Sequence, residues 1–175
     1  MSEDLRFPIG KFEQPKTISP EMREKFIQTI ESLPPNLKSA VEGLNDAQLD
    51  TPYRPEGWTI RQVIHHVADS HLNSFTRFKL GLSEDTPTIK VYDEAIWAEM
   101  ADAKNAPVEL SLSIIDGLHA RWTRLLKSMS EADFAKKVNH PERGAMSLGE
   151  LLALYDWHSR HHTAHVTKLR ERNGW

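Results

Sequence analysis

Four long segments of the chain repeat apolar residues at steps of three and four, and this spacing limits the possible folds more than any other feature. The segments cover residues 20–44, 59–82, 107–129 and 147–171. Steps of three and four place apolar side chains on one face of an α-helix, whereas a half-buried strand alternates apolar and polar residues. No stretch of similar length alternates in that way. The pattern therefore predicts an all-α protein.

The predicted helices begin at residues that can satisfy unpaired backbone N–H groups. Ser19-Pro20 places an N-cap residue before a proline at the first helical position. Thr59-Ile60-Arg61-Gln62 and Ser147-Leu148-Gly149-Glu150 both match the capping box, in which the first and last side chains bond backbone donors. Asn173-Gly174 ends the last predicted helix. These signals set the starts of three of the four helices.

Several shorter features lie within and between the predicted helices. The apolar spacing of the first helix continues through Pro34-Pro35, so we expect a kink there or two coaxial segments. Residues 46–57 are rich in turn-forming residues. Short helices are expected at residues 93–100 and 130–138, and residues 139–144 read as the tip of one small hairpin. The connections on either side of the third helix are therefore long.

Long connections between amphipathic helices are typical of a four-helix bundle with crossover connections, which is the fold we expect. Residues 1–18 carry little periodicity and are expected to form an extended N-terminal arm on the bundle. The whole chain, residues 1–175, is expected to form a single domain, because this length suffices to bury a core without disulfides or a structural metal. A metal in such a domain would be functional.

Composition excludes several classes of function. The 22 Lys and Arg residues are balanced by 25 Asp and Glu residues, with no long block of either sign, which argues against nucleic acid and anionic lipid as partners. No stretch approaches the roughly 20 apolar residues of a membrane span, and the start lacks a leader pattern. The expected location is therefore the cytoplasm. The absence of cysteine excludes disulfides, thiolate zinc sites and a cysteine nucleophile, leaving His, Asp and Glu as candidate ligands.

The nine histidines are the candidate chemical groups, and four of them fall between residues 158 and 165. Two histidines four apart on a helix point the same way and can bind one ion. His158 and His162 have this spacing and lie on or at the edge of the inward stripe of the last helix. His161 is expected to point outward. His165 lies near the same edge as His158 and is a possible extra or outer group.

A third ligand must come from another helix, and the second predicted helix offers three histidines. His71 lies near the middle of its apolar face, while His65 and His66 lie on opposite flanks, so helical geometry leaves this choice open. A lone inward histidine is more often a hydrogen-bonded core residue than a ligand, and this applies to both His71 and His119. His140 precedes a proline in a turn and is expected to be solvated.

The chain strongly resembles the DinB-like superfamily, and within it the YfiT group of metal-dependent hydrolases. The resemblance is carried by Gly57–His71 and Asp156–His165 and extends over nearly the whole chain. It implies a four-helix bundle that binds one divalent metal per subunit, zinc or alternatively nickel, through His66, His158 and His162. It also implies a homodimer. Relatives across the superfamily use low-molecular-weight thiols such as bacillithiol in transfer or isomerisation reactions.

Three neutral imidazoles leave a metal at least one open position, which is the arrangement of a catalytic site. The leading hypothesis is a metal-dependent hydrolase that activates a bound water against a small-molecule substrate. The alternatives are an S-transferase for a thiol of the bacillithiol type, a non-catalytic bundle that stores or senses a metal, and a bundle whose histidines only pack. No residue is assigned to an organic cofactor.

The sequence does not identify a catalytic base. It lacks the HExxH arrangement that places a glutamate beside the metal ligands. Asp69 and Asp156 could orient an imidazole through its second nitrogen, or could form caps and ion pairs on the helix surface. Arg61, Asn73 and Arg77 could bind an anionic substrate, although solvated surface roles are the simpler expectation for each.

Overall fold

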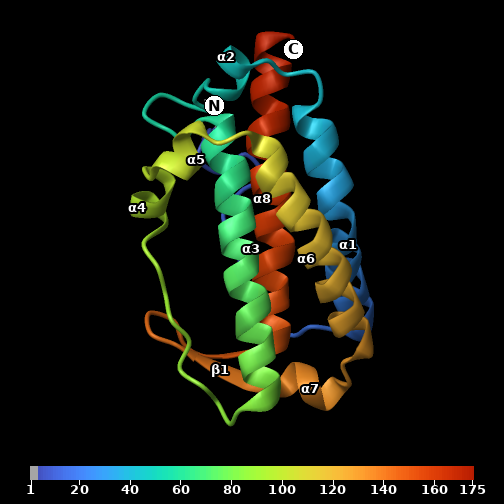
Figure 1. The fold of residues 1–175 in the computed structure, drawn as a ribbon. Coiled ribbons are helices and arrows are strands. Elements are labelled where there is room, and N and C mark those ends of the chain that lie inside the picture. Colours follow the sequence, from blue (N-terminus) through green and yellow to red (C-terminus); the bar gives the residue numbers. More distant parts are fainter. Residues whose placement is uncertain (1–3) are drawn as a thin grey trace.

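A computed structural model describes residues 4–175 and confirms the predicted four-helix bundle (Figure 1). The first three residues of the expected arm lie outside the described part of the chain. The four long helices are α1 (Pro20–Val41), α3 (Ile60–Ser83), α6 (Val108–Ser128) and α8 (Leu148–Asn173). Ser19, Thr59 and Ser147 cap α1, α3 and α8 through their side chains, as the sequence predicts.

The helices pack in a ring in which α1 contacts α6 and α8, and α3 contacts the same two helices. In Figure 1, α1 and α8 run in one direction and α3 and α6 in the other. The sequential helices α3 and α6 are therefore parallel neighbours, and the connection between them must return along the bundle. Residues 84–107 make this crossover and carry α4 (Glu94–Ala98) and α5 (Ala101–Asn105).

The second connection stays at one end of the bundle. It contains α7 (Glu131–Ala135) and the antiparallel pair β1 (Lys137–His140) and β2 (Gly144–Ser147), in which Lys137 pairs with Ser147 and His140 with Gly144. Of the short elements, α4, α7 and the hairpin match the predicted segments. Only the connection across residues 84–107 runs the length of the bundle (Figure 1).

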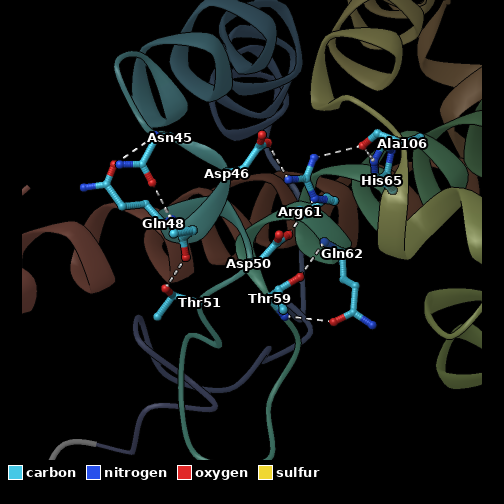
Figure 2. Close-up of polar contacts among 11 residues, drawn as sticks. Asn45, Asp46, Gln48, Asp50, Thr51, Thr59, Arg61, Gln62, His65 and Ala106 are labelled. Carbon is cyan, nitrogen blue, oxygen red and sulfur yellow. Dashed lines mark hydrogen bonds and ion pairs between the residues drawn. The ribbon is translucent and has the colours of Figure 1, made fainter.

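The short helix α2 (Asp46–Leu49) lies in the segment where we expected only turns. A capping box between Asn45 and Gln48 starts it, and Arg61 of α3 binds it from the side (Figure 2). Arg61 donates to the carboxylates of Asp46 and Asp50 at 2.8 and 2.6 Å. The expected surface or substrate-binding role of Arg61 is therefore wrong, because its buried side chain joins α2 to α3.

A single helix runs through both internal prolines of α1, so the alternative of two coaxial segments is wrong. Pro34 has no backbone N–H and cannot donate to the carbonyl of Ile30, four residues earlier. That carbonyl faces the interior of the bundle, where it accepts a hydrogen bond from His119 of α6. The proline thus frees a buried acceptor for another helix.

The core consists of two apolar clusters, and histidines occupy the level between them. On α3 the clusters are separated between Ala68 and Phe75, where His71 is fully buried. On α8 they are separated between Tyr155 and Val166, the segment that contains His158 and His162. A bundle of this length could be apolar throughout, so the layer of buried histidines is the place to look for a functional site.

The N-terminal arm, described from residue 4, lies on the outside of α8. Trp157 donates its indole N–H to the carbonyl of Gly10 at 3.1 Å, and the ring of Phe7 packs on His161. Between residues 4 and 175, none of the helices has the length and apolar character needed to cross a membrane.

Candidate metal centre

His66 of α3 and His158 and His162 of α8 converge in the middle of the bundle. One ring nitrogen from each of them lies within 4.8 Å of the other two. The Nε2 atoms of His66 and His158 are 3.2 Å apart. Two nitrogens bound to one tetrahedral zinc at about 2.0–2.1 Å stand about 3.3 Å apart. The residues therefore fit a single divalent ion without a change in helix positions.

The neighbouring residue His65 is occupied elsewhere, which resolves the choice that helical geometry left open. Its Nδ1 lies 2.7 Å from the Ser111 hydroxyl and its Nε2 lies 3.1 Å from the Ala106 carbonyl. Figure 2 shows its ring beside Ala106 at the start of α6. Because a carbonyl only accepts, Nε2 donates and Nδ1 accepts from the hydroxyl. Both nitrogens of His65 are used, so of these two neighbours His66 is the one that faces α8.

A chain of buried hydrogen bonds fixes the protonation of His158. The Ile30 carbonyl accepts from Nδ1 of His119 at 2.6 Å, so Nε2 of His119 carries a lone pair. That lone pair accepts from Nδ1 of His71 at 2.9 Å, and Nε2 of His71 accepts from Nδ1 of His158 at 3.1 Å. Each neutral ring donates through one nitrogen and accepts through the other, so all the hydrogen bonds of the chain point the same way. His158 is left with a lone pair on Nε2, which faces His66.

A shorter chain of hydrogen bonds fixes the protonation of His162. The Arg6 carbonyl in the N-terminal arm accepts from Nε2 of His165 at 3.3 Å. Nδ1 of His165 therefore carries a lone pair and accepts from Nδ1 of His162, also at 3.3 Å. The remaining lone pair of His162 is on Nε2. Two of the three candidate ligands are thus held in the tautomer that metal binding requires, each by a chain that ends on a backbone carbonyl.

Burial keeps the candidate ligands neutral. Burial and, secondarily, the neighbouring His161 lower the pKa of His66 to about 4. Burial, reinforced by the surrounding histidines, lowers the pKa of His158 and His162 well below the ordinary value. Burial also lowers the pKa of His119 to about 4. Since only the neutral imidazole ligates a metal, these residues are ready to bind at neutral pH.

We expect the metal-free protein to lose stability as the pH falls from 7.5 to 5.5. The unfolded chain protonates its histidines near pH 6.5, whereas folded His66 and His119 stay neutral until about pH 4. Stability is therefore complete above the unfolded pKa and declines below it, by about 1.4 kcal/mol per pH unit for each group. These two residues alone predict a loss of about 2–3 kcal/mol in urea unfolding. Equal unfolding free energies at the two pH values would contradict the assignment.

The structure corrects the predictions for two further histidines. His161 was expected to point outward, but it is buried because Phe7 of the arm and Trp157 cover its ring. His140 was expected to be solvated, but it is buried at the end of β1. For His161, part of the cover comes from the N-terminal arm, which is far away in sequence. His71 and His119 are hydrogen-bonded core residues, as the simpler interpretation held, and they also support a ligand.

Neither aspartate near the ligands orients an imidazole. Asp156 is buried and pairs with Arg160 at 2.6 Å, which is the ion-pair alternative. Asp69 is half-buried; burial and the nearby Asp102 raise its pKa to about 6, and its backbone carbonyl accepts from Asn73. The supporting groups are instead histidines and backbone carbonyls. The sequence indicated His165 as a possible outer group, whereas it did not reveal the contacts of His71 and His119, which join different helices.

A second trio, His161, His162 and His165, also brings ring nitrogens within 4.8 Å of one another. Both ring nitrogens of His165 are already hydrogen-bonded, to Arg6 and to His162. His162 is common to both trios and cannot serve two ions with one free lone pair. The first trio combines two helices and has a matching separation of nitrogens, so it is the better candidate.

The three histidines open onto a cavity of about 360 Å³. Trp58 and Trp157 form aromatic walls beside the ligands, and Ser70 and Tyr155 place hydroxyl groups next to His158. The cavity continues toward the hairpin, where Arg77 and other polar residues line it. A small molecule can therefore reach the open side of the trio.

The family model of the DinB superfamily matches residues 23–166, and the chain belongs to this superfamily. Relatives cover almost the whole chain. One from Bacillus mycoides (strain KBAB4), named "Putative metal-dependent hydrolase", is 54% identical over 173 residues and covers 99% of each chain. Another with that name, from Bacillus cereus (strain B4264), is 54% identical over 98% of this chain and 99% of its own.

Solved structures agree with this assignment. YfiT from Bacillus subtilis, described as "a probable metal-dependent hydrolase with an unusual four-helix bundle topology", superposes with a TM-score of 0.95. It is 48% identical and the match covers 98% of this chain and 99% of YfiT. The four-helix bundle protein TT2238 matches with a TM-score of 0.55 at 19% identity and shows the shared fold alone.

Proposed function

We propose that the protein is a metal-dependent hydrolase with one divalent ion, zinc or nickel, bound by His66, His158 and His162. The observation that carries this proposal is the convergence of three neutral imidazoles from two helices at the base of an accessible cavity. Three protein ligands leave an open position, whereas a structural zinc site is closed by four. The names of the relatives support the same class of reaction.

A divalent ion held by neutral ligands keeps its full charge and supplies Lewis-acid chemistry, lowering the pKa of a water in its open position to about 7. The protein supplies position and shielding. Ser70 and Tyr155 lie beside His158, and the Tyr155 hydroxyl donates to the Ser70 carbonyl at 3.1 Å. The Ser70 hydroxyl, 3.4 Å from Nε2 of His158, is therefore placed to hydrogen-bond a substrate at the open side.

Turnover of esters and amides tests this proposal. Zinc-loaded and nickel-loaded protein should hydrolyse at least one member of a panel, and His158→Ala should reduce the rate to background because a ligand is lost. His65→Ala is the matched control, since that ring does not face the site. A parallel assay with small thiols and monochlorobimane tests transfer chemistry. Thiol transfer that depends on His158, with no hydrolysis, would replace the hydrolase proposal with the S-transferase alternative.

A further inference from the structure

The cavity at the trio extends to a second polar group formed by Arg77, His140 and Arg143. Arg77 lies near the end of α3, while His140 and Arg143 belong to the hairpin and its turn. From the sequence, Arg77 and His140 are expected to have surface roles, yet each is only 8% exposed. Two buried polar side chains that face the same cavity require an explanation beyond solvation.

Arg77 carries a buried charge without a matching anion. Its Nη2 donates to the Lys90 carbonyl at 3.0 Å, while its Nε is buried and has no hydrogen-bond partner. Within residues 4–175, Arg77 forms no ion pair with a carboxylate. A buried guanidinium is costly unless it is paired and hydrogen-bonded. The positive charge of Arg77 is therefore available to pair with an anion that enters the cavity.

His140 adds a neutral donor to the same region. Its Nδ1 accepts from the backbone N–H of Glu142 at 3.2 Å, so the ring proton is on Nε2. Burial, and then the positive charges of Arg77 and Arg143, lower the pKa of His140 and keep it neutral. An oxyanion here would meet two cations and one N–H donor.

We propose that this end of the cavity binds a carboxylate group of the substrate, with Arg77 as the principal ligand and His140 as a second donor. The guanidinium fork matches a carboxylate in shape as well as charge. Glu94 and Glu142, both exposed, also line the cavity. Their charges disfavour a dianionic phosphate ester more than a monoanionic carboxylate. The inference rests on the proposed function, because it assumes that the other end of the substrate reaches the trio.

The separation of the two ends defines an extended substrate. Arg77 follows His66 by eleven residues on α3, about 16 Å along the helix axis. Helical side chains lean toward the N-terminus, so the long arginine side chain points back toward the trio and shortens this gap. The substrate would therefore carry its carboxylate several bonds away from the group that reacts.

Binding of adipic acid monohydroxamate and its terminal amide tests the inference. The two compounds share a metal-binding head and differ only in the charge at the tail. Titration calorimetry with zinc-loaded protein should show about tenfold tighter binding of the acid, as expected for a charged hydrogen bond. Arg77→Gln should remove this preference by weakening the acid alone, and Arg77→Lys should restore part of it. Lys79→Gln, which removes an exposed charge from the same helix, should preserve it.

The outcomes separate this inference from the proposed function. Equal affinity for the acid and the amide in the wild type, or no binding of either, would overturn the carboxylate site while the zinc content stays intact. Failure of the metal centre would appear instead as missing zinc. The metal-free His158→Ala variant should still prefer the acid, measured by the fluorescence of Trp58 and Trp157 in the cavity wall. An Arg77→Gln variant that weakens acid and amide equally would assign Arg77 a purely structural role.

Discussion

Replacing His66 or His162 with alanine is expected to abolish stoichiometric zinc binding. Each variant leaves two imidazoles at the centre, and loss of a direct ligand should weaken binding by more than the roughly 100-fold upper range for outer groups. The wild type, purified without an affinity tag, should contain one zinc or nickel ion per chain by elemental mass spectrometry. Chelator competition then gives the dissociation constants of the variants.

His161→Ala is the decisive control, because it distinguishes the two histidine trios. His162 belongs to both trios, whereas His66 belongs only to the first and His161 only to the second. We expect His161→Ala to retain the ion, although its ring is buried and not outward as the sequence indicated. The opposite pattern, with metal kept in His66→Ala and lost in His161→Ala, would move the site to the second trio.

Substituting His119 with phenylalanine is expected to weaken zinc binding about 10- to 100-fold, although His119 does not reach the ion. Phenylalanine preserves the ring shape but removes the acceptor for His71, so His158 is no longer held with its proton on Nδ1. His119→Gln keeps a side-chain acceptor and a donor and should recover part of the affinity. The substitution changes the protonation and orientation of the His158 ring and leaves the apolar packing in place, so the helices should remain folded.

Nitrogen-15 NMR of the imidazole rings provides a readout that a general loss of packing would not reproduce. In the metal-free wild type, His158 should carry its proton on Nδ1, whereas His119→Phe should show both tautomers. Circular dichroism would verify that the fold is retained. A variant with one unchanged tautomer and an unchanged dissociation constant would show that the chain from Ile30 to His158 does not prepare the ligand.

The long helices could be predicted from sequence because their signals are local. Apolar spacing and the capping residues Thr59 and Ser147 depend only on neighbouring residues, and they locate α3 and α8 closely. Of the short helices, α4 and α7 were expected and α2 and α5 were not, because four or five residues give too little periodicity for a reliable prediction. Arg61 holds α2 in place from a different helix, which a local pattern does not reveal.

The candidate site likewise has residues that local patterns predict and residues that only the packing of the helices identifies. Spacing on one helix selected His158 and His162, whereas the partner on α3 depended on which of His65 and His66 faces α8. That orientation follows from packing against α6, and the sequence settled it only through resemblance. Burial of His140 was missed for the same reason: the hairpin was expected, but its packing against α3 and the crossover segment joins distant parts of the chain. The donors and acceptors of a buried network emerge only from the assembled helices.

Pro34 creates a conflict between thermal robustness and metal affinity. An engineer who seeks a more robust protein would replace this internal proline with alanine, a standard way to improve a helix. Alanine would restore an N–H four residues after Ile30, and that N–H would compete with His119 for the same oxygen. This competition would weaken the first link of the hydrogen-bond chain that leads to His158. Pro34 thereby supports the candidate centre from α1, which, like α6, contributes no candidate ligand.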